Sequence, residues 1–168
     1  MYSILAGILI GAISKYLDDA PLTNLNILLI FLSLPLWYLY LSDFLLIGLA
    51  LLLAVLMAEK IDTITLSLYY VIAVIALFAV LLTTDQSGFR LAPFLIYLIA
   101  LYYDEREIKI LGMERVLIYL GILISSIIAI YLHITTGLDL QPYLKDLIGI
   151  ISFDIGYIIT SRFITQKI

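Results

Sequence analysis

The ionisable residues of this chain gather in short acidic segments that separate long apolar runs. Residues 58–63 hold a glutamate, a lysine and an aspartate within four positions, and apolar runs flank them on both sides. Similar segments occur at residues 15–19 and 104–107. Carboxylates beside cations can bind metal ions and phosphate groups, or can serve only to keep a loop in water.

A single acid, Asp154, interrupts the last apolar run. It lies six residues before the polar pair that begins at Thr160, which is roughly 9 Å inside the run at the rise of an α-helix. A carboxylate at that depth costs about 3 kcal/mol and normally faces the interior of a helix bundle or a wet cavity. Tyr157 and Ser161 fall on the same helix face as Asp154. We therefore expect Asp154 to have a functional role.

Carboxylates at several helix ends suit a magnesium site on a phosphorylated ligand. Mg²⁺ binds oxygen ligands in octahedral geometry and usually bridges to substrate phosphates, and nearby lysine or arginine can contact those phosphates. The sequence therefore predicts a Mg²⁺-dependent enzyme or binder that acts on a lipid diphosphate at the cytoplasmic face. The predicted metal ligands are Asp18, Asp62, Asp104 and Asp154, and the predicted phosphate-binding residues are Lys60, Arg106 and Arg162.

Two other functions fit the same acids. A small proton- or cation-coupled transporter or channel subunit would use Asp154 as the carrier site, with Glu59 and Asp62 beside it. A non-catalytic assembly subunit would need the acids only for the solubility of its loops. The chain contains no Gly-x-Ser-x-Gly elbow, His-Glu-x-x-His helix or glycine-rich phosphate loop. No motif therefore chooses between catalysis, transport and assembly.

The composition indicates an integral membrane protein. The 168 residues are 64% hydrophobic and 13% charged, and the mean hydropathy is +1.18, whereas soluble domains are about 45–50% apolar and about 25% charged. The net charge of −4 argues against nucleic-acid binding. The absence of cysteine excludes thiolate metal sites, and one histidine excludes a multi-histidine zinc site within the chain.

Seven apolar runs predict a bundle of seven short transmembrane helices. A spanning helix needs about 20 apolar residues. Pro35 predicts a kink in the second run, and the boundary at Ser42 and Asp43 is so short that a six-helix bundle with residues 27–57 as one element is the alternative. The first cation, Lys15, comes only at the end of the first run, which is the wrong order for a cleaved signal peptide, so this run is predicted to be a retained helix. The runs are residues 2–16, 27–41, 44–57, 64–82, 91–103, 116–132 and 143–160.

The cations predict the orientation of this single transmembrane domain, residues 1–168, in the cell membrane. Cytoplasmic loops are enriched in lysine and arginine. The predicted topology has the N-terminus outside and the C-terminus in the cytoplasm, and the six-helix alternative leaves the C-terminus there. In the seven-helix topology one side holds Lys15, Lys60, Arg106, Lys109, Arg115, Arg162 and Lys167, and the other holds Arg90 and Lys145.

Small residues form one face of the first run. Ser3, Gly7 and Gly11 are spaced four apart, and such a face allows another helix to approach closely. Packing against another helix of the same chain is the favoured interpretation, because such faces are common within bundles. A homo-oligomer through Gly7 and Gly11 is the alternative.

Overall fold

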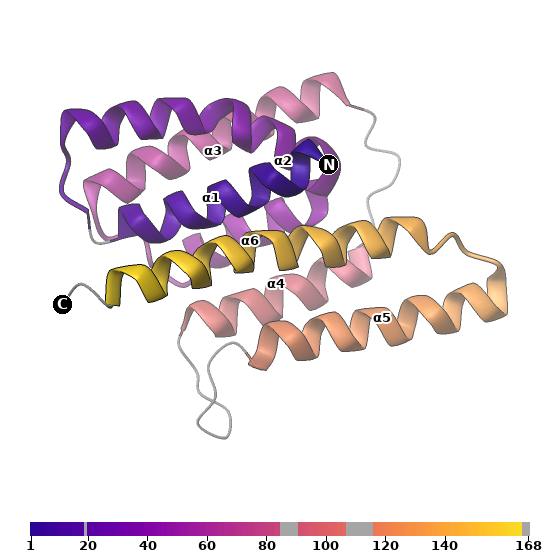
Figure 1. The fold of residues 1–168 in the computed structure, drawn as a ribbon. Helices are drawn as coiled ribbons and strands as arrows, with labels where there is room; N and C mark the ends of the chain where they lie inside the picture. The colour runs from indigo at the N-terminus through magenta and orange to yellow at the C-terminus, as the bar shows by residue number, and fades with distance from the viewer. Residues whose placement is uncertain (19, 85–90, 107–115, 166–168) are drawn as a thin grey trace.

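The computed structural model describes residues 1–18, 20–84, 91–106 and 116–165, and these residues form an all-helical bundle without strands (Figure 1). Five charged residues of the predicted acidic segments and orientation lie outside the described residues: Asp19, Arg90, Lys109, Arg115 and Lys167. The helices are α1 (Tyr2–Asp18), α2 (Asn24–Met57), α3 (Ile64–Thr83), α4 (Leu91–Glu105), α5 (Val116–Thr136) and α6 (Gln141–Thr165).

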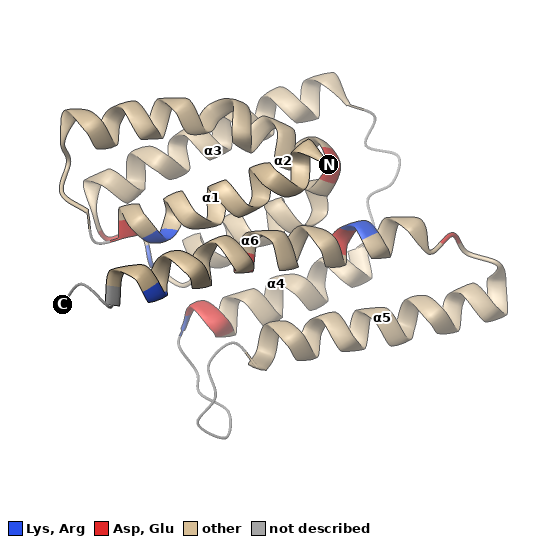
Figure 2. Cartoon of the chain, in the orientation of Figure 1, with Lys and Arg blue, Asp and Glu red and all other residues tan. Residues whose placement is uncertain are grey.

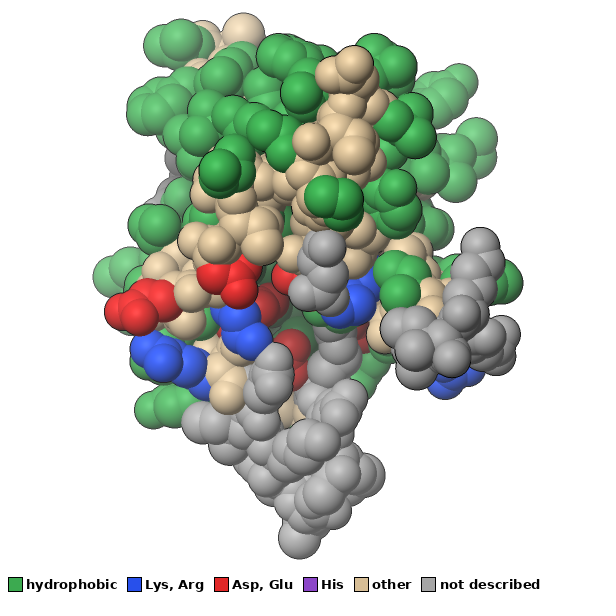
Figure 3. Space-filling model, turned by 90° about the vertical axis from the view of Figure 1, so that its left-hand side faces the viewer, with side chains coloured by type: hydrophobic (Ala, Val, Ile, Leu, Met, Phe, Trp, Pro, Cys, Tyr) green, Lys and Arg blue, Asp and Glu red, His purple; other side chains and the backbone are tan. Residues whose placement is uncertain are grey.

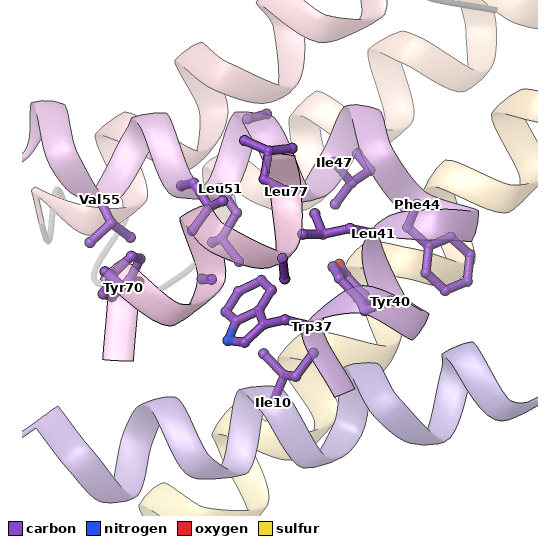
Figure 4. Packing of buried hydrophobic residues seen from close by; sticks show 14 of the residues in the cluster. Ile10, Trp37, Tyr40, Leu41, Phe44, Ile47, Leu51, Val55, Tyr70 and Leu77 are labelled. Carbon is purple, nitrogen blue, oxygen red and sulfur yellow. The ribbon is translucent and has the colours of Figure 1, made fainter. Parts of the chain in front are cut away.

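Helix α2 joins two of the predicted runs. The described residues thus form six helices rather than the predicted seven. The backbone leaves helical geometry inside α2 at Phe44 (φ −125°, ψ 39°), nine residues after Pro35, where the kink was predicted. Leu41 and Tyr40, from the arm before Phe44, reach Gly48 in the arm after it (Figure 4). The two arms of α2 therefore fold back on each other at Phe44.

Within the described parts of the chain, four helices are long and apolar enough to cross a membrane. They are α2, α3, α5 and residues Gln141–Ile164 of α6. Helices α1 and α4 are shorter, with 17 and 15 residues, or about 26 Å and 22 Å at 1.5 Å per residue. Large apolar side chains cover the outside of the bundle, for example Phe78, Ile127 and Tyr131, which are all more than half exposed. This outer surface supports the prediction of a membrane protein.

An aromatic cluster fills the centre of the bundle. Trp37 is fully buried, and its ring centroid lies 6.1 Å from that of Tyr40 and 5.8 Å from that of Tyr69. The Tyr69 hydroxyl donates to the Ile10 carbonyl oxygen and accepts from Ser14, both at 3.1 Å. Polar tips of buried aromatic residues need such partners. The cluster joins α1, α2 and α3 (Figure 4).

Glycines bring α1 and α6 into backbone contact. A methyl group added at Gly11 would overlap the carbonyl oxygen of Phe153, and one added at Gly156 would overlap that of Ile8. Gly7 faces the side chain of Ser152, whose hydroxyl oxygen a methyl group at this position would overlap. The small-residue face of α1 is therefore covered by α6 of the same chain, which is the favoured interpretation of that pattern.

The charged connection between α2 and α3 has a defined local structure. Glu59 has a positive φ of 58°, its amide donates to the Leu56 carbonyl, and the Lys60 amide donates to the Val55 carbonyl. These two hydrogen bonds form a Schellman motif that ends α2. Thr63 then begins α3, because its hydroxyl oxygen accepts from the Leu66 amide at 3.1 Å.

Replacing Glu59 with glycine is expected to stabilise the protein by about 0.5–1 kcal/mol. Glycine adopts a positive φ without the steric cost that a side chain carries, and Glu59 is solvent-exposed, so little packing is lost. Chemical unfolding in detergent micelles measures the change. Met57→Gly, two residues earlier inside α2, is the matched control and should destabilise by a similar amount. Destabilisation by Glu59→Gly, as by Met57→Gly, would contradict a left-handed conformation at Glu59.

Candidate binding site

Charged residues gather at the end of the bundle where α1, α4 and α6 end and where α2 connects to α3, here called the charged end (Figure 2). Figure 3 views this end and shows acidic and basic side chains together on one part of an otherwise apolar face. Helix ends position these groups, because each apolar helix becomes polar in its last turn. Lys15 and Asp18 belong to α1, Asp104 and Glu105 to α4, and Arg162 to α6.

A narrow cavity of about 20 Å³ opens among α2, α4, α5 and α6, enough for one water molecule. Three carboxylates line it: Asp104 and Glu105 from the last turn of α4, and Asp154 from α6. The Tyr40 ring also lines it. The apolar part of its wall consists of Ile47, Leu51, Leu101, Ile118, Ile150 and Phe153.

Asp154 is the most deeply placed of the three carboxylates. Its side chain is 4% exposed, as expected for an acid inside an apolar run. The Tyr119 hydroxyl of α5 donates to Oδ2 of Asp154 at 2.7 Å, and Oδ1 is buried as well. Asp104 and Glu105 are half-buried. The cavity thus joins a buried acid to two partly accessible ones.

Of the four predicted metal ligands, only Asp104 and Asp154 line this cavity. Asp18 pairs with Lys15 at 3.0 Å in the last turn of α1. Asp62 is exposed in the connection between α2 and α3. No group of three or more histidine, cysteine or acidic side chains in the described part of the chain is arranged to hold a metal ion by itself.

Tyr70 lies near acids of both α1 and α4. This residue of α3 is buried, and its hydroxyl lies within electrostatic range of Glu105, Asp18 and Tyr157. Tyr157 in turn lies 5.4 Å below the Lys15 ammonium and stacks on Phe153, which is part of the cavity wall. The α1 end of the charged surface is therefore close to the carboxylates of α4, although Asp18 does not line the cavity.

The predicted phosphate-binding cations lie near the polar surface rather than in the wall of the cavity. Lys60 is half-buried in the connection after α2. Arg106 is exposed beyond α4, and its guanidinium lies 5.7 Å from the Tyr102 ring centroid. Arg162 is exposed in the last turn of α6. All three remain accessible to an anion that approaches the charged end.

No family model, no curated protein and no solved structure matches this chain. Carboxylates beside an apolar wall can bind a cation together with an amphiphilic anion. Mg²⁺ commonly uses only one or two protein carboxylates and completes its shell with water and substrate phosphate, so the site needs no closed cage of protein ligands.

The sequence predicts no individual role for Glu105 and Tyr119 of this region, or for Asp146 near the opposite end of α6. Glu105 was grouped with its acidic neighbours without a role of its own, and Tyr119 resembles an interfacial aromatic residue. Asp146 is 3% exposed and within electrostatic range of the Tyr40 hydroxyl. Its position after Lys145, near the start of α6, resembles a solvated helix end. No local signal predicts its burial, which depends on packing against α2.

Proposed function

We propose that this protein is a multi-pass membrane protein whose charged end faces the cytoplasm and binds Mg²⁺ together with a lipid diphosphate, as an enzyme or a binder. The observation that carries the proposal is the convergence of Asp104, Glu105 and Asp154 on one cavity with an apolar wall. Carboxylates explain affinity for a divalent cation, and the apolar wall explains affinity for a hydrocarbon chain.

The proposed topology has seven membrane crossings, with the two arms of α2 as separate passes. The break at Phe44 and the contacts of Leu41 and Tyr40 with the following arm support this assignment. The described cations Lys15, Lys60, Arg106 and Arg162 then lie on one side and Lys145 on the other. The excess of cations supports a cytoplasmic charged end.

In the proposed complex, Asp104 and Asp154 would ligate the cation, with Glu105 beside them. Water and diphosphate oxygens would supply the other oxygen ligands that Mg²⁺ requires. Lys60, Arg106 and Arg162 would neutralise the remaining phosphate charge from the polar rim, where their side chains are accessible. This assignment narrows the predicted metal set, because Asp18 and Asp62 do not line the cavity.

The size of the cavity favours one alternative. A volume of about 20 Å³ beside the buried Asp154 suits a single small cation, and a buried acid inside a bundle is a common cation site in transporters. A cation-coupled transporter would give an ion flux in proteoliposomes that Asp154→Asn abolishes. A flux that survives the substitution would reject this alternative.

Thermal unfolding in detergent tests the proposed function. Mg²⁺ and a lipid diphosphate together are expected to stabilise the wild-type protein, because a ligand at a hundredfold excess over its Kd adds about 2.7 kcal/mol. Asp104→Asn should lose most of this gain, because the residue is a proposed metal ligand in the cavity wall. Asp62→Asn, an exposed acid outside the wall, is the matched control and should keep it.

Two outcomes of this experiment would reject the proposal. One is the absence of any joint stabilisation of the wild-type protein, which would favour a transporter or an assembly subunit. The other is an equal loss of stabilisation in Asp104→Asn and Asp62→Asn. That result would indicate general attraction of ions to the charged end rather than a site in the cavity.

A further inference from the structure

We infer that the bound lipid has a single hydrocarbon chain, that this chain occupies the apolar part of the cavity, and that it enters from the bilayer between α5 and α6. The inference rests on the proposed function and adds the class of lipid and its route. It is carried by the arrangement of the cavity wall and by the unequal packing of α6 against its neighbours.

The cavity wall changes from acidic to apolar along the bundle. Asp104 and Glu105 belong to the last turn of α4, at the charged end, whereas Leu101 lies one turn deeper. On α6, Ile150 lies one turn deeper than Asp154 in the same direction. A ligand that follows this wall has a charged head at the polar surface and a hydrocarbon chain pointing into the membrane.

The cavity must widen to admit a chain, because its volume of about 20 Å³ holds only a water molecule. Helix α6 cannot easily move away from α1, because Gly11 of α1 and Gly156 of α6 bring the backbones of the two helices into contact. Helix α5 is held to α4, where Gly121 faces the Ala100 side chain. The contact of α6 with α5 is the least extensive in the bundle, and that with α1 is the most extensive. Widening is therefore easiest between α5 and α6.

The Tyr119–Asp154 hydrogen bond lies at this weak contact. It joins α5 to α6 at 2.7 Å, so the contact between these helices, here called the seam, includes a carboxylate of the cavity wall. The outer side of α5 is apolar, and Leu123, Ile127 and Ile130 are more than half exposed. The seam therefore opens toward the hydrocarbon of the bilayer, where the chain of a lipid resides. Six residues form the apolar part of the cavity wall, and a surface of this size suits one chain rather than two.

A disulfide-type bridge between α5 and α6 tests the route. The chain contains no cysteine, so the double variant with Ile122→Cys and Ile151→Cys has a single pair of thiols. Each substituted position lies one turn from the Tyr119–Asp154 contact, on the same side of it, because the two helices are antiparallel (Figure 1). A short bis-methanethiosulfonate reagent would join them in lipid nanodiscs. Binding is measured by calorimetry with Mg²⁺ and either inorganic diphosphate, which has no chain, or farnesyl diphosphate.

Before bridging, farnesyl diphosphate is expected to bind at least tenfold more tightly than inorganic diphosphate. After bridging, this ratio should fall below twofold while the affinity for inorganic diphosphate is retained. The single-cysteine variants treated with the same reagent should keep the tenfold ratio. Leu101→Phe, which fills the cavity without a thiol, should lower the ratio in the same way and provides the test if the bridge does not form.

The outcomes separate this inference from the proposed function. A tenfold ratio that survives both the bridge and Leu101→Phe would place the chain outside the bundle and overturn the inference. Equal affinities of the two diphosphates for the unbridged protein would also overturn it, while the proposed headgroup site would stand. Failure of both diphosphates to bind in the presence of Mg²⁺ would reject the proposed function as well.

Discussion

Gly156→Ala is expected to destabilise the bundle by about 2 kcal/mol. The added methyl group would overlap the carbonyl oxygen of Ile8, which belongs to the backbone of α1 and cannot rotate away. Overpacking of this kind costs about 1–3 kcal/mol, and relief here requires separation of two helices along their most extensive contact. The gain in helix propensity, about 1 kcal/mol, offsets only part of this cost. Unfolding by denaturant in detergent micelles measures the difference.

Gly48→Ala is the matched control for this prediction. It is also a glycine-to-alanine change inside a helix, but the added methyl group meets the end of the Leu41 side chain rather than backbone. A side-chain end can adjust, so the expected cost is below about 1 kcal/mol. Gly11→Ala, which meets the Phe153 carbonyl, should behave like Gly156→Ala. Similar small effects at all three positions would contradict backbone contact between α1 and α6.

Asp154→Asn is expected to have opposite effects on ligand binding and on the stability of the unliganded protein. The substitution removes a buried charge, keeps nearly the same side-chain volume, and retains an oxygen that can accept from Tyr119. The free energy of unfolding without ligand should therefore be unchanged or raised by about 1 kcal/mol, because a buried charge is costly. The stabilisation by Mg²⁺ and lipid diphosphate, about 2.7 kcal/mol at a hundredfold excess over Kd, should disappear.

Tyr119→Phe separates the charge of Asp154 from its hydrogen bond. This variant keeps the carboxylate but removes the donor at 2.7 Å, so it should lower stability by about 1–2 kcal/mol while retaining Mg²⁺-dependent stabilisation. Thermal unfolding with and without ligands, on both variants, gives the comparison. A large loss of unliganded stability in Asp154→Asn would indicate a structural role for the carboxylate and would argue against the proposed site.

Three properties could be predicted from the amino-acid sequence alone: the helical class, the position of most apolar helices and the clustering of charged residues at helix ends. These properties are local, because a lipid environment requires each spanning segment to satisfy its own backbone hydrogen bonds. The depth of Asp154 within its run was also enough to indicate that its carboxylate would be buried. The close approach of another helix to Gly7 and Gly11 followed from their spacing in the same way.

The acids that lie together at the cavity can be identified only from the packing of the helices in three dimensions. Asp104, Glu105 and Asp154 share a cavity while Asp62 is exposed on the surface, although Asp62 lies in an acidic segment like that of Asp104 and Glu105. The partnership of α1 with α6 and the burial of Asp146 are likewise invisible in the local pattern. The reason is physical: hydropathy defines where a helix lies in the membrane, but its neighbours and its rotation depend on side-chain packing between segments that are distant in the chain.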